Sequence, residues 1–77
     1  MDESNLDIAL KTYKKYWRSP AVLRNRVLAS ILPDDDIERF WNIFRDKAMD
    51  NPDVNNSIAF GVMNEVKIKR EQEKKEI

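Results

Sequence analysis

The chain has 77 residues and a formal net charge of zero, because 14 basic side chains balance 14 acidic ones. Cysteine and histidine are absent. This composition excludes disulfide bridges, thiolate metal sites and the residue most often used as a general base near neutral pH. The single glycine and the 36% of charged residues favour a small helical protein over a strand-rich one. We expect one domain, residues 1–77, with a stability of only a few kcal/mol, roughly, because short chains bury little surface.

The N-terminal residues are acidic and lack the basic-then-apolar pattern of a signal peptide. No run approaches the roughly 18 apolar residues needed to cross a bilayer. We therefore expect a cytoplasmic protein that makes no membrane contact.

The charges are segregated along the chain. Residues 8–32 carry six basic side chains and no acid, whereas residues 33–53 carry seven acids and three bases. Segregated charge steers encounters and selects partners, and it says little about the fold.

The first predicted helix covers residues 5–18. Ser4 is the expected N-cap. One face is apolar and the opposite face is basic. The apolar face, which we expect to point toward the core, comprises Leu6, Ala9, Leu10, Tyr13, Tyr16 and Trp17.

The second predicted helix covers residues 20–32, and Ser19 followed by Pro20 is a strong start signal. We expect it to be the central helix, because its second half has little polar surface. Its apolar arc comprises Leu23, Val27, Leu28 and Ile31.

The third predicted helix covers residues 35–50. Acids in its first turn are favourable there, because the N-terminal end of the helix dipole is positive. Its apolar face comprises Ile37, Phe40, Trp41, Phe44 and Ala48.

The fourth predicted helix covers residues 53–70 and is followed by a charged tail, residues 71–77, that we expect to fray. Val54, Ile58 and Val62 recur every four positions. The β-branched content leaves a short strand as an alternative. Gly61 either permits close approach of another helix or is merely tolerated. Together the segments predict an all-α bundle of three to four helices with a charged C-terminal extension.

The strongest candidate site is a basic face that could contact an acidic protein or, as the less favoured alternative, nucleic acid. Its alternative interpretation is a solvated surface. The basic face comprises Lys11, Lys14, Lys15, Arg18, Arg24 and Arg26.

A second candidate is an acidic cluster that could dock to a basic surface, pair with the basic segment, or simply cap a helix. Its spacing does not follow that of a calcium loop, and no metal site is predicted. Acids at this helix start also argue against a helix-turn-helix recognition helix. The acidic cluster comprises Asp34, Asp35, Asp36 and Glu38.

Phe60 falls off the apolar arc of the fourth predicted helix. It is either a core filler or an apolar anchor at an interface, and it is retained here as the anchor candidate. No nucleophile-and-base constellation accompanies the carboxylates, so we predict no catalytic residue and no cofactor.

The order of a basic helix, a serine-led helix and an acidic-start aromatic helix resembles that of the Hha/YmoA type of small nucleoid modulators. The stretches that carry the resemblance are residues 9–17, 19–32 and 34–46, about half the chain. The fourth predicted helix departs from it. The resemblance implies a role in binding a partner protein and assigns no site residue.

Taken together, these patterns predict a non-catalytic interaction or regulatory protein that binds a protein partner through charged faces and apolar anchors. A nucleic-acid-associated regulator is the alternative. The small size is also compatible with a homodimer.

Overall fold

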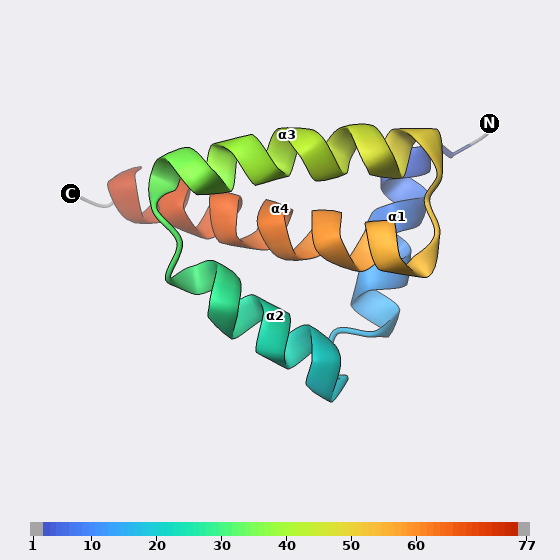
Figure 1. Cartoon of the computed structure of the whole chain (residues 1–77), viewed down its shortest axis with the longest axis horizontal. Helices are drawn as coiled ribbons and strands as arrows, with labels where there is room; N and C mark the ends of the chain where they lie inside the picture. Colours follow the sequence, from blue (N-terminus) through green and yellow to red (C-terminus); the bar gives the residue numbers. More distant parts are fainter. Residues whose placement is uncertain (1–2, 76–77) are drawn as a thin grey trace.

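The computed structural model describes residues 3–75, which form four helices and no strand (Figure 1). The predicted all-α bundle is therefore confirmed, and the strand alternative for the last segment is wrong. The helices are α1 (Asn5–Lys15), α2 (Pro20–Ser30), α3 (Asp34–Asp50) and α4 (Val54–Lys75).

Three helices begin at a side chain that accepts a backbone N–H. Ser4 Oγ accepts from Asp7 N at 3.2 Å, and Ser19 Oγ accepts from Val22 N at 3.3 Å. Asp53 Oδ1 accepts from Asn56 N at 2.7 Å at the start of α4. These contacts satisfy donors that a helix leaves unpaired in its first turn, and they fix where each helix starts.

The helix α1 ends at Lys15, three residues earlier than predicted. Ser19 is extended because it caps α2 ahead of Pro20, so the chain must leave the helix before it. The intervening N–H groups bond three residues back, as for Trp17 N to Lys14 O at 3.3 Å. The earlier end leaves Tyr16 and Trp17 partly exposed, so their predicted burial is wrong.

The helix α2 likewise ends at Ser30 instead of residue 32, and Leu32 N bonds Ala29 O three residues back. In contrast, α4 continues to Lys75, five residues beyond its predicted end. Arg70 and Lys74 form ion pairs with Asp34, which ties the last turns of α4 to the start of α3. Residues 71–75, assigned from sequence to a charged tail, are thus helical and exposed, and residues 76–77 lie outside the described range.

The central helix is α4, which packs against α1, α2 and α3 (Figure 1). The prediction that α2 is central is wrong, because only Val22 and Ala29 of α2 are buried. These two positions are seven residues apart and form one narrow strip. The helix α2 therefore lies at the periphery and contacts the body along a single line.

Phe60 is a core residue, with 3% of its surface exposed. Its ring lies 5.9 Å from that of Trp41, and it packs with Ala9 of α1 and Ala48 of α3. The prediction that Phe60 is an exposed anchor is therefore wrong, and the core-filler alternative is correct.

Gly61 allows α1 to cross α4 at close range. A Cβ at this position would lie 2.6 Å from Tyr13 Cβ, far inside van der Waals contact. The tolerance alternative for Gly61 is therefore wrong, because the position has no room for a side chain.

Candidate functional site

The predicted basic face divides into paired and unpaired cations. Lys11 pairs with Glu3, and Arg26 pairs with Glu65. Within residues 3–75 the other four form no ion pair and are exposed, so they remain available for an external partner. These four, called the unpaired cations below, are Lys14, Lys15, Arg18 and Arg24.

Arg26 is a structural residue, because α4 and the α1–α2 turn enclose it. Its Nη2 lies 3.5 Å from Glu65 Oε1, and its guanidinium lies 3.8 Å from the centroid of the Trp17 ring. Glu65 also accepts from Trp17 Nε1 at 3.1 Å and from the Tyr13 hydroxyl. One carboxylate of α4 thus joins α1, the following turn and α2. Arg26 is consequently not part of the exposed basic face that the sequence predicted.

Burial, together with the neighbouring Glu65 carboxylate, raises the pKa of the Tyr13 phenol far above its ordinary value of 10.0. A raised folded-state pKa contributes stability that is complete below the unfolded pKa and is lost as pH rises above it. We therefore expect the wild-type chain to lose about 1 kcal/mol more than Tyr13→Phe between about pH 9 and pH 11. Urea unfolding at each pH measures this difference.

Tyr16→Phe is the matched control, because Tyr16 is partly exposed and makes no such bond to a carboxylate within the described chain. It should follow the wild-type pH dependence of stability. Equal slopes for the wild type and Tyr13→Phe would contradict the burial of an un-ionised phenol beside Glu65.

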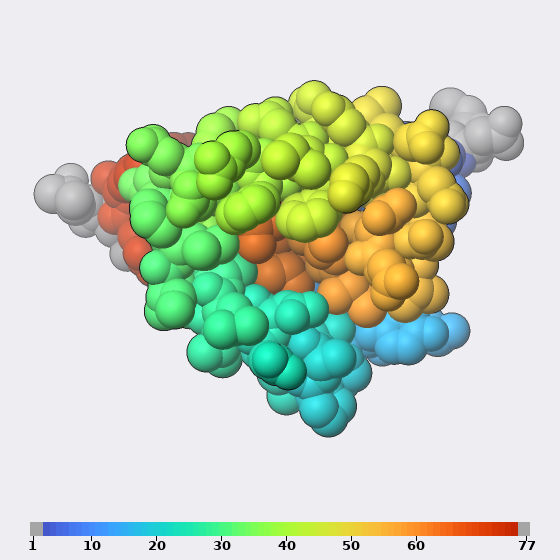
Figure 2. All heavy atoms as spheres, viewed as in Figure 1, coloured from blue at the N-terminus to red at the C-terminus, as the bar shows by residue number. Residues whose placement is uncertain are grey.

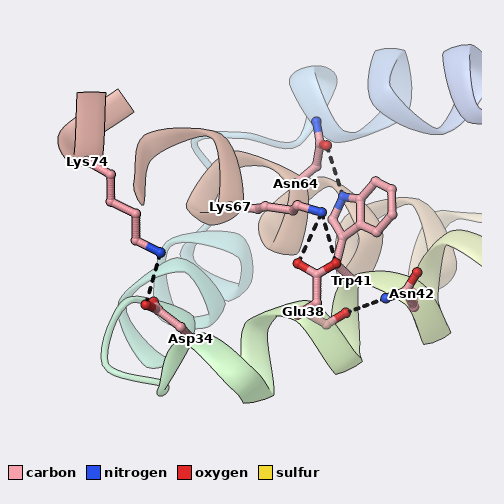
Figure 3. Close-up of polar contacts among 7 residues, drawn as sticks. All are labelled: Asp34, Glu38, Trp41, Asn42, Asn64, Lys67 and Lys74. Atoms are coloured by element: carbon pink, nitrogen blue, oxygen red, sulfur yellow. Dashed lines mark hydrogen bonds and ion pairs between the residues drawn. The ribbon is translucent and has the colours of Figure 1, made fainter. Parts of the chain in front are cut away.

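The acidic cluster is largely paired within the molecule (Figure 3). Asp34 binds Arg70 at 2.9 Å and Lys74 at 3.3 Å, while Glu38 binds Lys67 at 3.2 Å. Asp36 pairs with Arg39 at 3.0 Å in the next turn of α3. Only Asp35 of the four forms no ion pair within residues 3–75. The acids are thus satisfied mainly by α4, and not by the basic segment with which the sequence suggested they might pair.

The pairing changes the pKa of Asp34. Hydrogen bonds from Arg70 and then Lys74 lower the pKa of its carboxyl below the ordinary range. The side chain therefore stays ionised at mildly acidic pH and holds the end of α4 against the start of α3.

The most exposed apolar surface lies on α2. Its side chains recur along the solvent side of the helix, opposite the buried Val22 and Ala29. The members, called the apolar ridge below, are Leu23 (45% exposed), Val27 (66%), Leu28 (51%) and Ile31 (76%). An 11-residue helix that exposes three large apolar residues, with a fourth at its C-cap, presents a surface typical of protein interaction sites.

Sequence reasoning placed the apolar ridge in the core. A signal for its exposure exists, because α2 carries apolar residues on two sides, Val22 and Ala29 on one and the ridge on the other, and a single neighbour covers only one side. Glu65 was also missed as a site residue, since in sequence it resembles any other helical glutamate paired with a lysine four positions later.

A hollow of about 550 Å³ lies between α1 and α4 beside the Glu65 contacts. Leu10, Trp17 and Ile68 give it apolar walls, and Lys14 and Lys69 contribute to its lining. The carboxylate that lines the hollow is that of Glu65. It already accepts from Tyr13, Trp17 and Arg26, so it is not free to act as a base.

Residues 3–75 contain no group of three or more acidic side chains arranged to hold a metal ion. Across the same residues, no helix combines the length and apolar character needed to cross a membrane.

The chain matches no protein-family model, no curated protein and no solved structure. The resemblance to Hha/YmoA-type modulators therefore stays a prediction.

Proposed function

We propose that this chain is a non-catalytic helical module that binds a partner protein, and that the partner presents apolar and acidic side chains together. The observation that carries the proposal is the apolar ridge of α2, exposed along a helix whose N-terminal end adjoins the unpaired cations. Apolar contact would supply affinity, and the cations would orient the encounter.

The pairing pattern supports an acidic partner. Three of the four acids of the cluster are paired within the chain, two of them with α4, whereas four cations between residues 14 and 24 have no acid partner within residues 3–75. The overall neutral charge of the chain therefore hides a basic surface next to the ridge. A cytoplasmic setting belongs to the same proposal, because the cysteine-free chain needs no oxidising compartment.

The test is quantitative affinity capture from nuclease-treated extracts of the native cells. The immobilised chain is compared with Val27→Ser/Ile31→Ser and with Lys14→Glu/Lys15→Glu. Lys75→Glu is the control for charge reversal, because Lys75 is the last residue of α4, lies outside the hollow that Lys14 lines, and is exposed and unpaired within residues 3–75. We expect an acidic protein whose recovery falls about tenfold or more with each test variant and is unchanged with the control. Equal recovery by all four chains would remove the ridge as a binding surface.

A nucleic-acid-associated regulator is the second candidate, favoured by the exposure of Tyr16 and Trp17 beside basic residues. The Arg26 guanidinium already lies over the Trp17 ring, which reduces the surface on which a base could stack. Anisotropy titrations with DNA and RNA at two salt concentrations distinguish the candidates. Micromolar binding that weakens steeply with salt would support nucleic acid in place of a protein.

A further inference from the structure

A groove separates α2 from α3 on the face shown in Figure 2, where atoms of α4 lie between those of the two other helices. Its volume is about 350 Å³. Leu28 and Leu32 line the α2 side, Phe40 and Phe44 line the α3 side, and Val62 and Met63 lie below from α4. The groove is thus an apolar channel between two helices with a third helix as its floor.

The groove follows from how little of α2 is buried. The helix touches α4 through the strip containing Val22 and Ala29, so the side that bears Leu28 stands away from α3. On the other wall, the rings of Phe40 and Phe44 stack with centroids 6.2 Å apart and stay half-buried. Both walls therefore keep apolar surface that the chain itself does not cover.

The rims of this groove are basic. Arg24 precedes Leu28 by one turn on α2 and has no ion pair within residues 3–75. Lys47, also without an ion pair in that range, lies on α3 with Nζ 5.7 Å from the centroid of the Phe44 ring. Arg39 lies 5.3 Å from the Phe40 ring, but Asp36 already pairs with it, so Arg24 and Lys47 supply the unpaired charge. No acidic residue lines the groove. An occupant would therefore meet positive charge on both sides of an apolar floor.

We propose that the groove binds an amphipathic helix of the partner protein, with an apolar stripe flanked by acidic side chains. The inference rests on the proposed protein-binding function and specifies its ligand. A helix suits the site, because α2 is about 16 Å long and the groove runs between two helices. Apolar residues three and four positions apart would reach Leu28, Phe44 and Met63, and the flanking acids would reach Arg24 and Lys47.

Charge argues against a second copy of this chain as the occupant. The exposed apolar helix face that a second copy has to offer is the apolar ridge, and Arg24 lies on the same face of α2. Insertion of that face would bring Arg24 toward the basic rim, and like charges at an interface disfavour association. The acids of the cluster compensate little, since three of the four are already paired within residues 3–75.

The test uses two fluorescein-labelled designed peptides of about 16 residues, each with leucines at i, i+3, i+4 and i+7. One carries glutamates beside the leucines, and the other carries lysines at the same positions. With the full chain we expect micromolar binding of the acidic peptide and binding of the basic peptide at least about tenfold weaker. Arg24→Glu/Lys47→Glu should reverse this preference, whereas Lys69→Glu/Lys75→Glu makes the same charge change away from the groove and should preserve it.

A second variant tests the groove without changing charge. Ala59 lines the groove and is half-buried on α4, so Ala59→Leu should fill part of the channel and weaken the acidic peptide about tenfold while α4 stays helical. Circular dichroism checks that the variant is folded. Unchanged binding by Ala59→Leu, or a preference that survives the Arg24 and Lys47 reversals, would overturn the groove as the site.

Two outcomes separate this inference from the proposed function. Ridge-dependent capture of a protein without any binding of the acidic peptide would overturn the groove inference and leave the proposed function in place. Sedimentation showing self-association that Ala59→Leu abolishes would make a second copy the occupant, which also overturns it.

Discussion

Replacing Glu65 by leucine is expected to destabilise the fold by about 1–3 kcal/mol, because it removes an acceptor shared by three donors. The Tyr13 hydroxyl is buried and loses its partner, while the Trp17 indole and the Arg26 guanidinium are closer to solvent and can regain water. The effect should be largest on α2, since Arg26 is the α2 side chain in this cluster. Urea unfolding measures the total loss, and amide hydrogen exchange should show α2 opening more than α3.

Two variants control this prediction. Glu71→Leu changes an exposed glutamate of α4 without an ion pair in residues 3–75, so its effect should stay within about 0.5 kcal/mol. Glu65→Gln keeps an oxygen acceptor but loses the charge, and it should lie between the two leucine variants. If Glu65→Leu unfolds at the same urea concentration as Glu71→Leu, the carboxylate does not join α1 and α2 to α4.

The helix starts were predictable because local chemistry decides them. Ser4 and Ser19 carry a hydroxyl that caps the next helix, and Pro20 suits the first helical position. The ends were less predictable: α1 stops early because Ser19 caps α2 ahead of Pro20, whereas the last turns of α4 make distant contacts. Glu71 and Lys75, four positions apart, favour helix locally, and the pairing of Arg70 and Lys74 with the distant Asp34 ties these turns to α3.

The position of α2 shows where periodicity stops being informative. Leu23, Val27 and Ile31 form a correct apolar stripe for a helix, yet this stripe faces solvent. The smaller residues Val22 and Ala29 face α4, because they allow a closer approach. Periodicity identifies an apolar face but does not identify the neighbour that covers it.

The candidate site was predictable only in part for the same reason. The exposure of Lys14 and Lys15 follows from their place opposite the apolar face of α1, and Arg24 is exposed on the side of α2 away from the buried Val22 and Ala29. Arg26 and Asp34 are not free surface charges, because Arg26 pairs with Glu65 and Asp34 pairs with Arg70. These partners are 39 and 36 residues away in sequence, and only the folded chain brings them together. A charge block in sequence is therefore a poor guide to free charge on the surface.

Phe60→Ala is expected to have the largest effect of any single substitution considered for this chain, a loss of about 3–5 kcal/mol. The ring is buried against Trp41 and between Ala9 and Ala48, small residues that leave a cavity when it is removed. A 77-residue chain has a total stability of only several kcal/mol, roughly, so the variant should be largely unfolded by circular dichroism at 25 °C.

Phe60→Leu and Ile31→Ala make the prediction specific. Leucine keeps much of the apolar volume, so Phe60→Leu should remain folded with a loss of about 1–2 kcal/mol in urea unfolding. Ile31→Ala removes a side chain that is mostly exposed and should change stability by less than about 0.5 kcal/mol. If Phe60 were an anchor at an interface, Phe60→Ala would weaken binding to the partner and leave the stability of the free chain unchanged. A folded, fully stable Phe60→Ala would therefore contradict the buried position of Phe60, whereas its unfolding beside a stable Ile31→Ala would support core packing by Phe60.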